Sequence, residues 1–207
     1  MRLYLASANA HKAAEFQAMA DALRAGQAPG AARIDVVPAG AAGGMPAVEE
    51  DTGTFLGNAR KKAAALKGRL PSDAWALADD SGLCVEALGG APGVESAYYA
   101  GPRGDSAANL AKLVDAMAGI PDARRGAEFV CVLVLMGPGG LEKAFSGRCA
   151  GRLAGAPRGK GGFGYDPLFL PHGYEVTLAE MAPELKHRIS HRGVAWGDCV
   201  GWLAARG

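Results

Sequence analysis

The sequence feature that most constrains the fold is an uninterrupted apolar run near residue 130. Residues 129–135 read Phe-Val-Cys-Val-Leu-Val-Leu, so both faces of a strand formed here would be apolar. We therefore expect a strand over Glu128–Met136 that lies centrally in a sheet and is covered on both sides. After the turn-forming residues 137–140, Glu142–Cys149 is predicted to return as its hairpin partner.

Helix-capping signals and shorter apolar runs alternate along the rest of the chain. Asn9 precedes a stretch with helical spacing of apolar residues, and Thr54 and Asp105 are placed to cap two further helices. Thr177–Glu180 has the form of a capping box, and Pro183 is suited to the first turn of a helix. The remaining predicted elements are strands at 1–7, 34–37, 75–78, 84–88 and 167–170 and a last helix at about 190–206.

Length and charge limit the class of protein. The 207 residues suit one domain, with two lobes and a sizeable core, and 49% hydrophobic with 21% charged residues is ordinary for a globular chain. The balance of 22 basic and 21 acidic residues argues against a general electrostatic interaction with nucleic acid or a membrane. Basic clusters must therefore be interpreted locally.

Cysteine spacing and hydropathy indicate the compartment. The four cysteines are isolated, without a Cys-x-x-Cys pair, so neither a zinc ribbon nor a disulfide scaffold is indicated. The apolar N-terminus is too short for a signal sequence, and no run reaches membrane-spanning length. We expect reduced thiols in a cytoplasmic protein.

Two adjacent carboxylates follow a short apolar run. Trp75–Ala78 reads as a strand, Asp79 and Asp80 end it, and Ser81-Gly82 predicts a turn. In a strand the two aspartates point to opposite faces, so only one of them is expected to reach a given metal ion. The alternative is an Asp-rich turn with solvated side chains, and the pair by itself does not decide between the two.

The stretch from Ser7 to Lys12 connects a predicted strand to a predicted helix. Backbone N–H groups and the helix dipole attract phosphate at such a place, and Ser7, Asn9 and Lys12 add donors. The alternative is a solvated capping turn, because the stretch lacks the glycines of a phosphate-binding loop.

A second donor-bearing segment is the glycine-rich loop Gly155–Asp166. It fails the spacing of a Walker A loop and lacks its hydroxyl residue. Arg158 and Lys160 still place donors near a phosphate or nucleoside, and Phe163 or Tyr165 offers a face for a base. A surface loop that needs glycine for its turns is the alternative.

Further acids and cations complete the set. Glu49–Asp51 precedes a predicted helix, where it either complements the helix dipole or supplies a second segment of carboxylates to a hard cation such as Mg²⁺. Lys62 lies on that helix and is either a ligand donor or part of a solvated face. Two acid clusters with cationic and amide donors are the set expected in a metal-dependent enzyme that acts on a polyphosphate.

Two histidines near the C-terminus have the spacing of a zinc motif. His187 and His191 are separated by three residues, but Arg188 replaces the glutamate of His-Glu-x-x-His and no third ligand is indicated. Lys186, His191 and Arg192 are better suited to donate hydrogen bonds to an anionic or carbonyl-bearing ligand. A solvated cationic face is the alternative.

Taken together, six ordered motifs resemble the inosine triphosphate pyrophosphatase family, whose bacterial members are the dITP/XTP pyrophosphatases that act on non-canonical purine nucleotides. The motifs span nearly the whole chain. They are Ser-Ala-Asn-Ala-His-Lys at 7, Phe-Leu-Gly-Asn-Ala-Arg-Lys-Lys-Ala at 55, Ala-Asp-Asp-Ser-Gly-Leu at 78, Leu-Gly-Gly-Ala-Pro-Gly-Val at 88, Gly-Gly-Phe-Gly-Tyr-Asp-Pro at 161 and Ser-His-Arg at 190.

The resemblance implies a fold and an activity. The fold would be α/β, one domain over residues 1–207 with a long mixed sheet and two lobes flanking an active-site cleft, usually as a homodimer. The activity would be Mg²⁺-dependent hydrolysis of dITP, ITP and XTP to the monophosphate and pyrophosphate, which cleanses the nucleotide pool.

The resemblance also implies residue roles. Glu50 and Asp80 would hold the metal, and Asp80 would be the catalytic proton acceptor. The sequence departs from the resembled family at Gly57, where the family commonly has Glu before Asn-Ala, so an acid role at this position is not expected to carry over. The substrate-binding residues would be Ser7, Ala8, Asn9, Ala10, His11, Lys12, Lys62, Ser81, Phe163, Gly164, Tyr165, Asp166, Lys186, His191 and Arg192.

Selectivity can be argued from hydrogen-bond donors. Hypoxanthine and xanthine present a 6-oxo acceptor where adenine has an amino donor, and Arg192, which has donors only, satisfies the oxo group alone. Guanine shares the 6-oxo group, so its rejection needs another contact. Two alternatives stay open: a pyrophosphatase for other altered nucleotides, such as a septum-associated nucleotide pyrophosphatase, and a nucleotide-binding module without catalysis.

Overall fold

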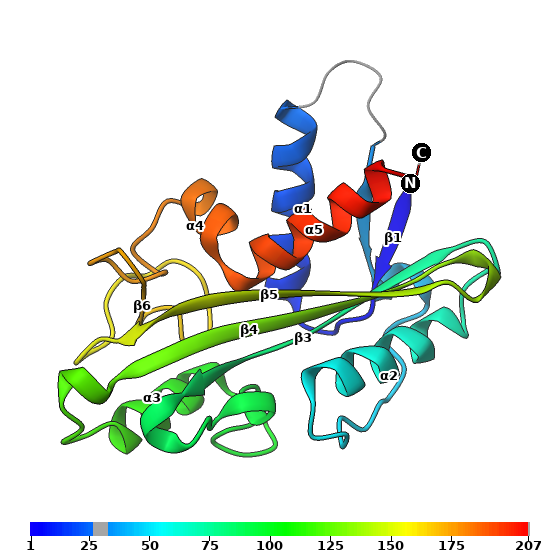
Figure 1. Cartoon of the computed structure of the whole chain (residues 1–207). Coiled ribbons are helices and arrows are strands. Elements are labelled where there is room, and N and C mark those ends of the chain that lie inside the picture. Colours follow the sequence, from blue (N-terminus) through cyan, green and yellow to red (C-terminus); the bar gives the residue numbers. More distant parts are fainter. Residues whose placement is uncertain (27–32, 207) are drawn as a thin grey trace. The chain divides into compact units, whose positions relative to one another are not determined.

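A six-stranded mixed sheet with helices forms the fold in the computed structural model, which describes residues 1–26 and 33–206 (Figure 1). The strand order is β2-β1-β3-β4-β5-β6; β1 is parallel to β2 and β3, and β5 is antiparallel to β6. The predicted α/β class is confirmed. The strands are β1 (Arg2–Leu5), β2 (Asp35–Pro38), β3 (Trp75–Val85), β4 (Gly126–Met136), β5 (Glu142–Leu153) and β6 (Phe169–Pro171), and the helices are α1 (Ala10–Gly26), α2 (Phe55–Lys67), α3 (Ser106–Ala116), α4 (Pro183–Ile189) and α5 (His191–Ala204).

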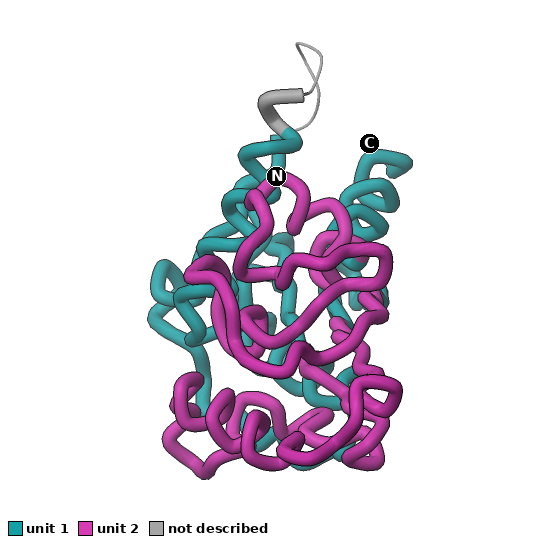
Figure 2. Tube along the Cα trace, turned by 90° about the vertical axis from the view of Figure 1, so that its left-hand side faces the viewer, with its two compact units in different colours: residues 1–80, 132–146, 195–207 teal, residues 81–131, 147–194 magenta. Residues whose placement is uncertain are grey.

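The chain divides into two compact units, which Figure 2 colours separately. Their boundaries fall inside β3, β4, β5 and α5, so these elements contribute residues to both units. That the whole chain is one domain with a cleft stays a prediction. Unit 1 comprises residues 1–80, 132–146 and 195–207, and unit 2 comprises residues 81–131 and 147–194.

In unit 1, helices cover both faces of the sheet (Figure 1). The buried stripe of α2, Ala59, Ala63 and Leu66, packs in one cluster with Ala78 of β3 and Val134 of β4. On the opposite face lie α1 and α5, which meet through the edge-to-face rings of Phe16 and Trp196, 5.6 Å between centroids. These contacts fix the two helices that carry Lys12 and Lys62.

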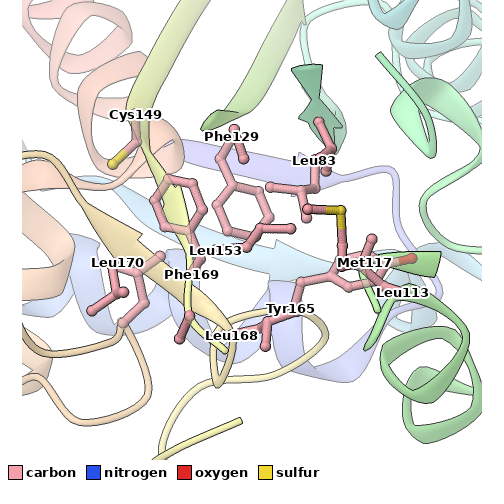
Figure 3. Close-up of a cluster of buried hydrophobic side chains, with 14 residues drawn as sticks. Leu83, Leu113, Met117, Phe129, Cys149, Leu153, Tyr165, Leu168, Phe169 and Leu170 are labelled. Carbon is pink, nitrogen blue, oxygen red and sulfur yellow. The ribbon is translucent and has the colours of Figure 1, made fainter. Parts of the chain in front are cut away.

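In unit 2, a cluster of large apolar side chains forms the core (Figure 3). Leu83 of β3, Met117 beside α3 and Phe169 of β6 belong to it. Phe129 of β4 packs edge-to-face on Phe169 at 4.8 Å between centroids. The apolar run at residues 129–135 is central, as predicted, since β4 lies between β3 and β5 and has buried residues in both units.

Three predicted helix caps are confirmed. The side-chain oxygen of Asn9 accepts from the backbone N–H groups of His11 (2.9 Å) and Lys12 (3.2 Å). Thr54 Oγ1 accepts from Gly57 N at 3.1 Å, and an Asp105 carboxylate oxygen accepts from the first turn of α3. Each cap satisfies N–H groups that lack a partner within the helix.

The predicted turn at Ser81-Gly82 is wrong. Residues 75–85 form one continuous strand, β3, and the strand predicted at 84–88 ends at Val85, after which residues 86–88 form a 3₁₀ turn. β3 pairs with β1 through residues 75–77, and β4 is its hydrogen-bonded neighbour on the other side. Those ladders outweigh the local turn preference of Ser and Gly.

The helix start predicted at Thr177 is also wrong. Glu180 does accept from Thr177 N at 2.7 Å, as in a capping box. The Thr177 hydroxyl, however, donates to the carbonyl of Arg158 at 2.9 Å and does not cap a helix. The segment therefore forms a turn that ties down the glycine-rich loop, and the next helix, α4, begins at Pro183 as predicted.

No helix within residues 1–26 and 33–206 combines the length and the apolar character needed to cross a membrane.

Candidate active site

A carboxylate cluster in unit 1 consists of Asp80, Lys62 and Glu50. Asp80 lies in β3, and Lys62 projects from α2 close to the buried stripe of that helix. The Lys62 ammonium donates to Asp80 Oδ1 at 2.6 Å and to Glu50 Oε2 at 2.9 Å. The Lys62 ammonium group thus bridges Glu50 and Asp80, the two residues that the resemblance assigns to the metal.

The Asp80 and Lys62 charges of this cluster are largely held away from water, whereas the Glu50 side chain is 31% exposed. Burial raises the pKa of the Asp80 carboxyl to about 6 from its usual 3.8, although the Lys62 and Lys12 ammonium groups oppose the change. The neighbouring Asp79 carboxylate adds to the rise. For Lys62, burial favours the neutral amine, but the surrounding carboxylates, chiefly that of Asp80, outweigh burial and raise its pKa. At neutral pH the cluster therefore contains an ammonium group and a carboxylate that retains a high proton affinity.

Asp79 forms an ion pair with Lys12 from the first turn of α1. The Asp79 side chain is fully buried. Asp80 pairs with Lys62 of α2 and Asp79 with Lys12 of α1, and these helices lie on opposite faces of the sheet (Figure 1). The predicted opposite orientation of the two aspartates is therefore confirmed. The sequence analysis gave Asp79 no specific partner. The alternation of side chains along a strand placed it on the face opposite Asp80, which is the face that α1 covers.

Three backbone N–H groups of the turn between β1 and α1 donate to side chains of the same turn. Asn9 accepts from the N–H groups of His11 and Lys12, and Asn9 N donates to Ser7 Oγ at 3.1 Å. These N–H groups are therefore engaged within the chain. Residues 8–11 are exposed. The phosphate contact predicted for this turn stays a prediction, with the side chain of Lys12 as its cation.

Two of the three acids at 49–51 pair with different lysines. Glu50 shares Lys62 with the carboxylate cluster, whereas Asp51 pairs with Lys61 at 2.5 Å on the surface. The Lys61 ammonium also lowers the pKa of the exposed Asp51 carboxyl. The structure therefore brings Glu50, and not Asp51, to the same lysine as Asp80.

The donor set of the carboxylate cluster fits a hard divalent cation. Asp80 Oδ2 is buried and has no hydrogen-bond partner in the part of the chain that the structure describes, and Glu50 offers a partly exposed carboxylate. Among the described residues, no three His, Cys, Asp or Glu side chains gather to form a complete metal site. Mg²⁺ commonly takes one or two protein carboxylates and completes its shell with water and substrate phosphates, so the residues present suffice.

An aromatic cluster in unit 2 consists of Phe163, Asp166, Lys186 and Arg192. Asp166 Oδ2 accepts from Lys186 Nζ at 2.9 Å and from Phe163 N at 2.8 Å. The Lys186 ammonium lies 5.5 Å and the Arg192 guanidinium carbon 5.1 Å from the centroid of the Phe163 ring. Gly162, at φ +68°, permits this loop, because a Cβ there would lie 2.1 Å from Asp166 Oδ2. The cluster thus places two cations against a half-buried ring.

Two neighbouring contacts hold the start of α5. Arg192 Nη2 donates to Ser81 Oγ at 2.5 Å. His191 is 2% exposed and stacks on Phe129 with 4.6 Å between centroids and 7° between the ring planes. The Ser81 and Arg192 predicted to bind substrate therefore lie together, whereas the His191 ring is packed in the core.

Tyr165 is not an exposed aromatic. It is 5% exposed within the core cluster of unit 2, and its hydroxyl donates to the carbonyl of Ser96 at 2.8 Å. Ser96 in turn accepts from Leu83 N through its own hydroxyl at 2.9 Å. Sequence reasoning missed Ser96, which no motif singled out. Of the two aromatic residues considered for stacking, only Phe163 lies beside the cationic side chains.

Two sequence features are settled by local geometry. His187 lies within α4 and His191 is the first residue of α5, so the pair does not lie on one continuous helix. Gly57 sits where a Cβ would meet Thr52 Oγ1 at 2.3 Å and Thr54 Oγ1 at 2.8 Å. The glutamate common in the resembled family would therefore require a different arrangement of the α2 N-terminus.

The mixed sheet and its helices define an α/β protein, in which unit 1 carries the carboxylate cluster and unit 2 the aromatic cluster. The family model described as the Ham1 family matches residues 3–202, and the chain belongs to this family.

Named relatives and a solved structure agree with this assignment. The chain is similar to the dITP/XTP pyrophosphatase of Opitutus terrae, 55% identical over 202 residues that cover 98% of each chain. It is 45% identical to the dITP/XTP pyrophosphatase of Leifsonia xyli, over 99% of this chain and 96% of the relative. The Ham1 protein structure of Staphylococcus aureus aligns over 100% of both chains with a TM-score of 0.82 and 33% identity.

Proposed function

We propose that the chain hydrolyses dITP, ITP and XTP to the nucleoside monophosphate and pyrophosphate, and so removes deaminated purine nucleotides from the pool. The observation that carries this proposal is the Asp80 carboxylate, which is buried, bonded to Lys62 through one oxygen and without a hydrogen-bond partner at the other among the described residues. Full-length similarity to proteins named dITP/XTP pyrophosphatase supports the choice of substrate.

Asp80 is assigned the proton-accepting role. Release of pyrophosphate requires water to attack the α-phosphorus, and a carboxylate with raised proton affinity both orients that water and accepts its proton. Lys62 and Lys12 are cationic partners of the adjacent aspartates, placed to balance charge on a polyphosphate. Mg²⁺, held by Glu50 and Asp80, would neutralise phosphate oxygens and polarise the reacting phosphorus.

The aromatic cluster is assigned the base. The Phe163 ring offers a stacking face, and Arg192 offers donors to the 6-oxo group that distinguishes hypoxanthine and xanthine from adenine. The Ser81 contact limits the positions open to the guanidinium. Adenine, which presents an amino donor at this position, would leave a donor facing a donor.

The resemblance also supports a cytoplasmic homodimer with Mg²⁺ as its cofactor. Size-exclusion chromatography with light scattering tests the dimer, and chelation followed by addition of single divalent metals tests the cofactor.

A substrate panel tests the proposed function. Pyrophosphate release is measured with Mg²⁺ on ITP, dITP and XTP and on ATP, GTP, dTTP and UTP. We expect kcat/KM to be highest for the three deaminated purines. Preference for dTTP and UTP would favour a pyrophosphatase for other altered nucleotides, and binding of ITP without pyrophosphate release would favour a non-catalytic module.

A further inference from the structure

The junction of α4 and α5 depends on a very close approach at Gly193. α4 ends at Ile189, Ser190 is extended (φ −70°, ψ 156°), and α5 begins at His191. A Cβ on Gly193 would lie 1.7 Å from the carbonyl oxygen of His187 and 2.7 Å from its carbon. Backbone atoms cannot yield as a flexible side chain does, so any other residue would force the two helices apart.

Hydrogen bonds close the same junction. Ser190 N donates to Lys186 O at 2.9 Å and completes the last turn of α4. Gly193 N donates to Ser190 Oγ at 3.1 Å, and Val194 N donates to Ser190 O at 2.9 Å, which starts α5. A single extended residue thus terminates one helix and caps the next, and glycine allows their backbones to touch.

The junction connects the two cations of the aromatic cluster. Lys186 lies on α4 and is fixed by Asp166, and Arg192 lies on α5 and is fixed by Ser81. Both cationic groups lie against the Phe163 ring, at 5.5 and 5.1 Å from its centroid. A change in the angle between α4 and α5 would alter the spacing of these groups along any ligand stacked on the ring.

We propose that Gly193 is a positioning residue for base selection. By allowing the backbones of α4 and α5 to touch, it sets the distance between Lys186 and Arg192. That distance in turn sets where the Arg192 guanidinium meets the 6-oxo group of a purine stacked on Phe163. This inference rests on the proposed function. It concerns discrimination between purine bases, and the ratio of binding affinities for two nucleotides measures this discrimination without catalytic turnover.

The test compares Gly193→Ala with Gly197→Ala. Gly197 lies on the same helix, and a Cβ there meets nothing within 4 Å, so Gly197→Ala controls for a methyl group on α5. Equilibrium binding of IMP and AMP is measured with Mg²⁺ by calorimetry, because these monophosphates lack the bond to be cleaved. Pyrophosphate release from ITP is measured separately and reports on the proposed function alone.

We expect Gly193→Ala to lower the ratio of IMP to AMP affinity about 10- to 100-fold, as a small misplacement of a binding group does, and Gly197→Ala to preserve it. In an Arg192→Ala background, which lowers the ratio itself, Gly193→Ala should cause little further loss. An unchanged ratio in Gly193→Ala, a wild-type protein that binds IMP and AMP equally, or fully additive losses in the double variant would overturn the inference.

A second variant covers the case in which Gly193→Ala does not fold. Ser190→Ala removes the oxygen that accepts from Gly193 N and adds no clash. We expect a smaller fall of the same ratio with the fold retained by circular dichroism. A folded Ser190→Ala protein with the wild-type ratio would contradict the role of the junction.

Discussion

Lys62 and Lys12 pair with three carboxylates of unit 1, those of Asp79, Asp80 and Glu50. A divalent cation held by Glu50 and Asp80 would add positive charge beside these acids. Sequence reasoning selected the acids from their types and motif positions. It did not give the pairing, because Lys62 and Asp80 come from elements whose packing fixes which side chains meet.

At Glu50, the pairing with Lys62 predicts a role that its neighbour Asp51 lacks. Glu50→Gln should raise the Mg²⁺ concentration for half-maximal activity at least about 10-fold, because a carboxylate ligand is lost. Asp51→Asn is the matched control, since Asp51 pairs with Lys61 at the surface. Magnesium titrations of ITP hydrolysis measure both, and an equal effect of the two changes would contradict the assignment of Glu50.

At Asp80, the raised pKa predicts the acidic limb of the pH profile. The carboxylate form is the proton acceptor, so kcat/KM at low Mg²⁺ should fall as the pH drops through about 6, the pKa of Asp80 in the metal-free fold. Higher Mg²⁺ should move the limb to lower pH, because a bound cation favours the ionised carboxyl. A limb near the ordinary carboxyl pKa of 3.8 at low Mg²⁺ would argue against Asp80 as the base.

The same shift has a defined effect on stability. The pKa of Asp80 is higher in the fold than the ordinary 3.8, so its contribution to stability is complete below that pH and is lost as the pH rises through about 6. At neutral pH without metal, the ionised carboxyl therefore weakens the fold at the place where function needs it.

At the scale of elements, local signals predicted the helices better than the strands. The caps of α1, α2 and α3 are contacts within four residues, so the sequence alone contains both partners. The path of β3 depends on β1 and β4, which are distant in sequence. The turn predicted from Ser81-Gly82 was wrong because the local sequence does not contain these partners. Thr177 failed for the same reason, since its hydroxyl bonds Arg158 in a distant loop.

In the glycine-rich loop, the Tyr165 hydroxyl is expected to hold the segment that carries Phe163 and Asp166. Tyr165→Phe removes the bond to Ser96 O, which should cost about 1 kcal/mol of stability and loosen the segment that carries Phe163 and Asp166. We expect KM for ITP to rise with little change in kcat. Tyr98→Phe is the control, because Tyr98 is 48% exposed. A lower Tm with wild-type KM would show that Tyr165 supports the core alone.

The buried Cys199 thiol in α5 should make the stability of the fold sensitive to alkaline pH. Burial raises the pKa of the Cys199 thiol to about 12 from 9.0, so its stabilising contribution is present below pH 9 and is lost as the pH rises toward 12. By pH 10.5 the loss is about 2 kcal/mol, which corresponds to about 4–8 °C in Tm.

Thermal unfolding between pH 8 and 10.5 measures this effect. Cys199→Ala should show a smaller decline of Tm with pH than the wild type, whatever its starting Tm. Cys84→Ala is the comparison variant: burial also raises the pKa of the Cys84 thiol, but this thiol is only partly buried, so the decline of Tm should stay closer to that of the wild type. Parallel declines in wild type and Cys199→Ala would contradict the expected ionisation.

At the scale of the whole chain, each unit carries one of the two clusters. Unit 1 ends a segment at Asp80 of the carboxylate cluster, and unit 2 begins one at the next residue of β3, Ser81, whose hydroxyl accepts from Arg192 of the aromatic cluster. The family match over residues 3–202 includes both units. The proposed reaction accordingly assigns phosphate and base chemistry to different parts of one chain.

In the proposed reaction, water attacks the α-phosphorus of a deaminated purine triphosphate, and the position of an oxygen isotope in the products shows which phosphorus was attacked. ITP is hydrolysed with Mg²⁺ in H₂¹⁸O, and the products are separated and analysed by ³¹P NMR and mass spectrometry. We predict IMP that carries one ¹⁸O atom and unlabelled pyrophosphate, with product formation lost in Asp80→Asn. Label in pyrophosphate, release of inorganic phosphate with IDP, or near wild-type turnover in Asp80→Asn would contradict the account.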